Sequence, residues 1–169
     1  MTANRLVLAG FSEIPRRLIH CLNTHQVRYE IIHEPEKPNC NTSIDLNAPL
    51  VSAYIVNASN QRVLIVAPMN RQLDLNKVRA VLGHPVRLET EDEFKWLFPD
   101  CALGAVPPFG SLYGLPTYMD RSLVKSPDIV FAAGTTTDWI RLGCDSYLEI
   151  VKPTFGRFLL TERRQSCKL

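Results

Sequence analysis

The chain has 169 residues, of which 46% are hydrophobic, and its formal net charge at pH 7 is +2. This length predicts a single domain with a sizeable core, and the small net charge is not that of a typical nucleic-acid binder, so any RNA contact must be local. No apolar run approaches the roughly 20 residues that span a bilayer, and the first residues lack the features of a signal peptide, which predicts a soluble cytoplasmic protein.

The first third of the chain predicts a helix, a strand and a long loop. Ser12 is a plausible N-cap for a helix that carries apolar residues on one face and ends near Thr24. Residues 27–31 alternate apolar and polar side chains, as a half-buried strand does. Residues 33–49, rich in Pro, Asn and Ser, predict a long loop.

The middle of the chain predicts a hairpin followed by a helix. Residues 50–56 and 62–67 are rich in β-branched and aromatic residues, and turn-forming residues separate them. Asp74 can cap the next helix, and Gly83 stands where a left-handed C-terminal cap belongs.

The remaining elements are short. Thr90 and Glu93 form a capping-box pattern for a brief helix. Strands are expected at about 117–119, 128–133 and 138–142. Helices and strands interleave without a regular βαβ rhythm, which predicts an α+β fold.

Three signatures follow one another in the second half of the chain. Residues 104–110 read Gly-Ala-Val-Pro-Pro-Phe-Gly, residues 118–123 read Tyr-Met-Asp-Arg-Ser-Leu, and residues 130–134 read Val-Phe-Ala-Ala-Gly before a polar Thr-rich turn. Glycines allow the backbone to approach a ligand closely, and two prolines stiffen the first segment. Taken alone, the first segment is more simply a rigid turn with Phe109 in the core.

In this order the signatures resemble the YbaK and prolyl-tRNA-synthetase-associated editing domain family, over roughly residues 12–152. The resemblance implies a mixed, barrel-like sheet with packed helices, and a single domain over residues 1–152 with a C-terminal tail at 153–169. It also implies hydrolysis of wrongly charged aminoacyl-tRNA, with the tRNA acceptor end as partner and without a metal or other cofactor.

The resemblance assigns catalytic positions to Gly104, Pro108 and Gly134. Substrate-binding positions are expected at Ser52, Ala53, Tyr54, Phe109, Gly110, Asp120, Thr135 and Asp138. Several of these have a structural alternative: Asp120 could orient the terminal ribose or cap its own turn, and the hydroxyls of residues 135–137 with Asp138 could replace a histidine that family members often carry or cap a turn.

One departure concerns a lysine. Active members of the family usually carry a lysine on the strand that matches residues 50–56, where its charge can engage a phosphate or the ribose. This chain reads Val-Ser-Ala-Tyr over residues 51–54, and neither Lys37 nor Lys77 is at the matching position. His33, at the end of the first strand, could act as a general base or be an ordinary surface group.

Two functions follow from these residues. The leading prediction is a trans-editing deacylase that hydrolyses the ester of a tRNA charged with a small wrong amino acid. The alternative is a catalytically weakened domain that binds tRNA, an amino-acid ligand or a protein without turnover. The five cysteines are widely spaced and contain no C-x-x-C pair, which favours reduced structural thiols. The amino acid, the tRNA and the oligomeric state cannot be deduced from the sequence.

Overall fold

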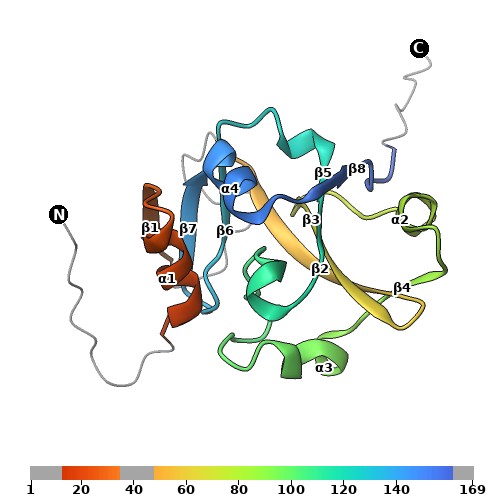
Figure 1. The fold of residues 1–169 in the computed structure, drawn as a ribbon, viewed down its shortest axis with the longest axis horizontal. Coiled ribbons are helices and arrows are strands. Elements are labelled where there is room, and N and C mark those ends of the chain that lie inside the picture. Colours follow the sequence, from red (N-terminus) through yellow and green to blue (C-terminus); the bar gives the residue numbers. More distant parts are fainter. Residues whose placement is uncertain (1–12, 35–47, 162–169) are drawn as a thin grey trace, which may run out of the picture.

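A computed structural model describes residues 13–34 and 48–161 (Figure 1). Its eight strands form one mixed sheet in the order β1-β7-β6-β2-β3-β5-β8, and β4 also pairs with β2. The strands are β1 (Tyr29–His33), β2 (Leu50–Ala58), β3 (Gln61–Pro68), β4 (Val86–Leu88), β5 (Thr117–Asp120), β6 (Asp128–Ala132), β7 (Asp138–Gly143) and β8 (Thr154–Gly156).

Helices pack against this sheet, so the fold is α+β with a mixed sheet, as predicted. The α-helices are α1 (Arg16–Thr24), α2 (Leu75–Leu82), α3 (Glu91–Phe94) and α4 (Cys144–Val151), and the 3₁₀ helices are η1 (Lys95–Leu97), η2 (Gly110–Tyr113) and η3 (Arg121–Leu123). None of the helices in the described residues is long and apolar enough to span a membrane.

The local signals in the middle of the chain are confirmed. The predicted hairpin is β2 and β3, which pair antiparallel from Val51 and Pro68 to Ala58 and Gln61. Asp74 accepts hydrogen bonds from two backbone N–H groups of α2, and Gly83 ends that helix with a φ of 72°. The side chain of Glu93 accepts from the backbone of Thr90 at 2.8 Å, as a capping box requires.

The other boundaries differ by a few residues, and two strands, one α-helix and the 3₁₀ helices η2 and η3 were not predicted. The first helix ends at Thr24 as expected but begins after Pro15, and Ser12 lies outside the described residues. The first strand starts at Tyr29, two residues later than expected, because its register is set by pairing with β7. β4, α4 and β8 were missed: two are three-residue strands held by pairing, and α4 has no side-chain cap.

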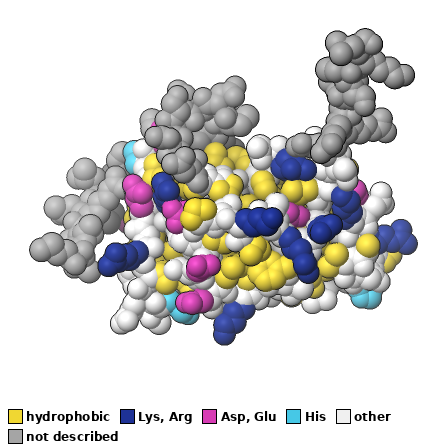
Figure 2. Space-filling view, turned by 90° about the horizontal axis from the view of Figure 1, so that it is seen from above, with side chains coloured by type: hydrophobic (Ala, Val, Ile, Leu, Met, Phe, Trp, Pro, Cys, Tyr) yellow, Lys and Arg dark blue, Asp and Glu magenta, His cyan; other side chains and the backbone are white. Residues whose placement is uncertain are grey.

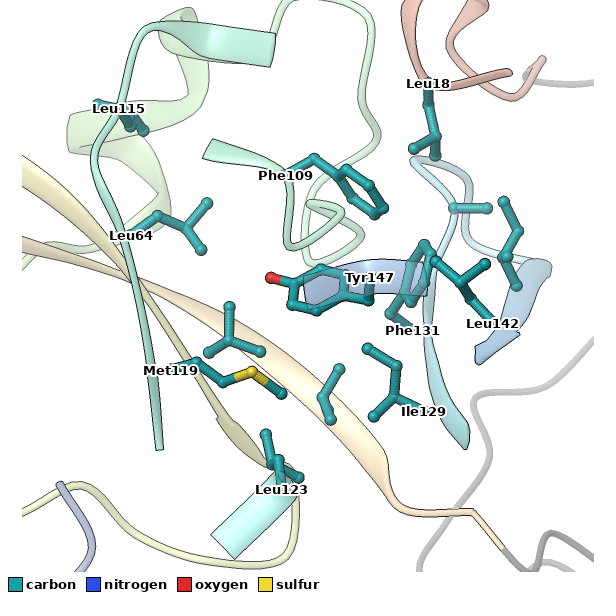
Figure 3. Close-up of a cluster of buried hydrophobic side chains, with 14 of the residues drawn as sticks. Leu18, Leu64, Phe109, Leu115, Met119, Leu123, Ile129, Phe131, Leu142 and Tyr147 are labelled. Atoms are coloured by element: carbon teal, nitrogen blue, oxygen red, sulfur yellow. The ribbon is translucent and has the colours of Figure 1, made fainter. Parts of the chain in front are cut away.

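The main hydrophobic core lies between the sheet and helices α1 and α4 (Figure 3). At its centre Phe109 packs on Phe131 and Tyr147, with ring centroids 5.3 Å apart in each pair. The hydroxyl of Tyr147 donates to the carbonyl of Pro108 at 2.6 Å. The second half of the Gly104–Gly110 segment is therefore anchored in the core.

The ordered chain continues beyond residue 152. β8 pairs in parallel with β5, and Phe158 is fully buried against Val63, Ile65 and Val78. These residues belong to the same sheet and add a second small core beside the hairpin. The boundary at residue 152 remains a sequence-based prediction.

Candidate functional site

The site begins with an interruption along β2. One edge of β2 pairs with β3 over its whole length, whereas the other edge pairs with β6 at Leu50 and Val51 and with β4 from Val56 to Ala58. Figure 1 shows β6 beside the start of β2 and β4 beside its far end. Residues 52–54 therefore lie between two ladders and face a gap in the sheet.

This gap leaves backbone groups of β2 unpaired. The carbonyl of Leu50 accepts from Met69 on the β3 side, whereas the carbonyl of Ile55 accepts from Glu89 on the opposite side. Backbone groups alternate sides along a strand, so the N–H and C=O of Ala53 point toward the gap. Nothing in residues 13–34 and 48–161 hydrogen-bonds to them there.

A cavity of about 440 Å³ occupies this position. Its wall combines the middle of β2, the segment after β4, the start of the Gly104–Gly110 segment, the end of β6 and the start of β7. The lining residues are Val51, Ser52, Ala53, Tyr54, Ile55, Met69, Leu88, Glu89, Thr90, Glu91, Phe94, Gly104, Val106, Ala132 and Trp139. The predicted residues Ser52, Ala53, Tyr54 and Gly104 thus share one cavity.

The segment that contains Gly104 lies against the turn that contains Gly134. The backbone N–H of Ala102 donates to the carbonyl of Gly134 at 2.8 Å. Ala105 packs with Ala132 and Trp139 in a small cluster of buried residues. Gly104 lines the cavity. Residues 134–138 do not, although Ala132 and Trp139 on either side of them do.

Gly134 itself is confined by α1. Its φ is +87°, and a Cβ at this position would come within 2.6 Å of the Pro15 ring. Only glycine fits here without displacing the start of α1. The glycine therefore has a structural reason to be present, whatever its part in a reaction.

Pro108, Phe109 and Gly110 lie behind the cavity wall. Phe109 is fully buried in the core, and a Cβ on Gly110 would collide with the side chain of Thr117 and the carbonyl of Leu115. Their side chains do not line the cavity. They support the loop from which Gly104 and Val106 reach the cavity.

Asp120 is committed to the fold. Its side chain is 4% exposed; one carboxylate oxygen accepts from the N–H of Ser122 at 2.9 Å and the other from the N–H of Phe158 at 2.7 Å. It caps its own turn and ties β8 to β5. Of the two roles that the sequence allows, the contacts match the cap.

Thr135 and Asp138 also form a local network, which includes His33. The Thr135 hydroxyl donates to one oxygen of Asp138 at 2.8 Å, and Nδ1 of His33 lies 3.0 Å from the other oxygen. The pair ties the ends of β1 and β7 together, because these two residues are partners in the ladder. His33 is not in the cavity wall.

Glu89 is an acidic group in the wall that was not predicted from the sequence. The side chain of Glu89 is fully buried; it accepts from Nε of Arg62 at 2.7 Å and from the Asn57 amide at 3.0 Å. Arg62 in turn lies over the ring of Trp96, 5.4 Å from its centroid. Polar residues far apart in the chain carry no local signal for such a network.

Cys101, near the second turn, is not a nucleophile at neutral pH. Burial raises the pKa of its thiol to about 11, and the hydroxyl of Tyr113 lies 3.2 Å from its sulfur. A thiol with this pKa stays protonated at pH 7, so it lacks the reactive thiolate. Within the described residues no group of His, Cys, Asp and Glu side chains could hold a metal ion.

Ser52 and Ala53, where the family resemblance led us to expect a lysine, face opposite sides of the sheet. By the sheet register, Ser52 shares a face with Leu50, Ala132 and Trp139, whereas the Ala53 side chain packs against the main core. Both residues line the cavity. A long cationic side chain would therefore reach the cavity more directly from Ser52.

Positive side chains gather on one part of the surface. Most of the Lys and Arg side chains visible in Figure 2 lie in its right half, on the side that holds β5, β8 and α2 in Figure 1. Arg121, which follows β5, and Arg157, which follows β8, are exposed.

Residues 41–150 match the model of a family described as the aminoacyl-tRNA editing domain. A search of curated proteins found no match. The solved structures with similar folds include three for which the match covers 86% or more of this chain. The first, described as a candidate trans-editing enzyme for prolyl-tRNA synthetase, has a TM-score of 0.70 and 22% identity, with 86% of this chain and 96% of that chain covered.

The second, described as hypothetical protein APE2540, has a TM-score of 0.73 and 16% identity, with 86% of this chain and 100% of that chain covered. The third is described as a candidate signal transduction protein from Marinobacter aquaeolei; it has a TM-score of 0.72 and 16% identity, and the match covers 88% of this chain and 31% of that one.

Proposed function

Because this chain belongs to the aminoacyl-tRNA editing domain family, we propose that it is a deacylase that hydrolyses the ester of a tRNA charged with a small wrong amino acid. The observation that carries the proposal is the cavity beside β2, where the Gly104 loop meets the unpaired stretch of the strand. At about 440 Å³, the cavity is within the lower part of the range of small-molecule sites.

The chemistry asks little of side chains. An aminoacyl ester is already activated, so its hydrolysis needs a positioned water and donors for the charge that develops on the carbonyl oxygen. Water attacks the carbonyl carbon, the bond to the ribose oxygen breaks, and that oxygen leaves with a proton as the terminal hydroxyl. Backbone N–H groups of the Gly104–Gly110 segment and of β2 are among the donors that this chain offers for that charge.

The apolar part of the wall is where we propose that the amino-acid side chain binds. Val51, Val106, Phe94 and Ala132 line the cavity and can contact a small apolar side chain. One methylene discriminates by only about 1 to 3 kcal/mol at a single site, which is why a second, hydrolytic site is useful in translation. We propose the single-stranded acceptor end of tRNA as the partner.

One specific observation favours a second function. The wall has a serine and an alanine where active family members carry a lysine, and its one buried carboxylate, Glu89, is neutralised by Arg62. A site without that cation could bind an aminoacyl group and release it unhydrolysed. In that case the chain is a binding domain for tRNA, an amino-acid ligand or a protein.

The test is loss of the ester from tRNAs charged with alanine, cysteine or serine. We expect at least one to be deacylated well above the spontaneous rate. No loss on any of them, with binding retained, would favour the binding domain. Ser52→Lys then separates two causes: a gain in rate means that only the cation was missing, and a flat response means that the cavity has a different use.

A further inference from the structure

Trp139 carries an unexplained polar atom. Its side chain is 5% exposed, and within the described part of the chain its indole Nε1 has no hydrogen-bond partner. A buried donor without a partner costs roughly 1 to 3 kcal/mol, so such atoms are rare in folded proteins. Trp139 is also one of the residues that line the cavity.

The position of Trp139 connects it to the unpaired stretch of β2. Trp139 is the ladder partner of Ala132, and the last bridge between β6 and β2 joins Phe131 to Val51. Continued by one residue, that register would place Ser52 beside Ala132. Trp139 and Ser52 therefore lie on one face, about two strand spacings apart, or roughly 10 Å.

The wall of the cavity thus includes two residues, Trp139 and Ala53, with polar groups that have no partner among the described residues. The indole N–H can only donate, whereas the backbone of Ala53 offers both an N–H and a C=O toward the gap. The other orphaned side-chain atom in the described residues, the hydroxyl of Thr117, is not in the cavity wall. Trp139 combines a missing partner with a place beside a ligand-sized space.

We propose that Trp139 binds the substrate directly: its indole N–H donates to the carbonyl oxygen of the aminoacyl group in the cavity. The proposal rests on the proposed function for the identity of the ligand. The stronger acceptor of an esterified amino acid such as alanine is its carbonyl oxygen, and its ammonium group only donates. The C=O of Ala53, which has no partner among the described residues, supplies an acceptor for that ammonium group.

The probe is an adenosine that carries alanine through an amide at its 3′ position, which cannot be hydrolysed by this route. The chain has two tryptophans, and Trp96 is 63% exposed with its Nε1 donating to the carbonyl of Glu93. In Trp96→Phe protein, Trp139 is the sole tryptophan, so its emission reports directly on the cavity. We expect a saturable change in that emission as the probe is added.

The matched substitution is Trp139→Phe, which keeps an aromatic ring and removes the N–H. We expect it to weaken binding of the probe about tenfold, as measured by calorimetry, because a donor to the ligand is lost. Trp96→Phe should leave this affinity unchanged. Trp139→Phe also removes buried ring volume, so we expect its melting temperature to fall, and affinities are compared at a temperature where every variant is folded.

Hydrolysis gives the second readout. If Trp139 contacts the carbonyl, Trp139→Phe lowers kcat/KM on the best tRNA by about tenfold or more. The proposal is overturned if the probe binds Trp139→Phe as tightly as the wild type, or binds without altering the emission of Trp139. If the probe binds as expected but no charged tRNA is hydrolysed, the proposed contact with Trp139 is supported and the proposed deacylase function is wrong.

Discussion

Two buried polar residues of this molecule, Asp120 and Trp139, are almost equally hidden from solvent but differ in their hydrogen bonds. Asp120 is 4% exposed, and both of its carboxylate oxygens accept backbone hydrogen bonds. Trp139 is 5% exposed, and within the described residues its indole nitrogen has no partner. The first belongs to the turn between β5 and η3 and also binds the N–H of Phe158 just after β8, and the second belongs to the wall of the cavity.

The difference separates structure from candidate function. A buried carboxylate with all its acceptors in use stabilises the fold and has little left for a ligand. A buried donor without a partner weakens the fold, so a cavity beside it suggests what the missing partner is. The residues of the Asp120 turn should then affect stability alone, and those of the cavity should affect binding.

The largest effect on stability is expected from Arg62→Met. Glu89 is fully buried, and removal of its close cationic partner leaves only the Asn57 amide and the more distant Arg87 beside that charge, at a cost of about 3 kcal/mol. Chemical denaturation measures the change. Arg87→Met is the control, because Arg87 is 3.9 Å from Glu89 and mostly exposed; an equal loss there would show that the Glu89 network does not depend on burial.

Asp120→Ala sharpens the comparison next. It leaves the buried N–H of Phe158 without an acceptor, and we expect a loss of about 2 to 3 kcal/mol in the free energy of unfolding. Binding of the alanyl-adenosine probe should be unchanged at a temperature where the variant is folded. Asp92→Ala, at a side chain that is 87% exposed, should cost well under 1 kcal/mol. Weaker probe binding in the Asp120 variant would return this residue to the site.

The smallest effect concerns the capping box beside the cavity. The hydrogen bond from Arg87, and then the one from the Thr90 backbone, lower the pKa of Glu93 from 4.5 to about 2. A depressed acid stabilises the fold above its unfolded pKa, and this contribution is lost as the pH falls toward 2. The melting temperatures of wild type and Glu93→Gln should differ by a constant amount above about pH 5 and converge near pH 2. A gap that persists at pH 2 would contradict this origin.

The sequence predicted what local signals can encode. The β2–β3 hairpin, the cap at Asp74, the turn at Gly83 and the box at Thr90 depend on residues a few positions apart, and all four are confirmed. β8 escaped prediction because three residues form a strand only when β5 supplies hydrogen bonds.

The site was predicted in part for the same reason. Glycine and proline marked the Gly104 loop, and the family resemblance indicated the middle of β2. The cavity, however, depends on where β2 separates from β6, which is set by the register of strands about 80 residues apart in the chain. Neither the ion pair of Glu89 nor the unpartnered nitrogen of Trp139 has a pattern in the sequence.

The central claim is that an aminoacyl ester is hydrolysed in the cavity beside β2, and one measurement tests it most directly. The rate of deacylation of the preferred charged tRNA is compared between the wild type, Ser52→Phe, which places a bulky ring in the cavity wall, and Ser111→Phe, the same change at an exposed residue outside it. We expect the first variant to lose at least about tenfold in rate and the second to match the wild type. Equal rates in all three folded proteins would contradict the claim.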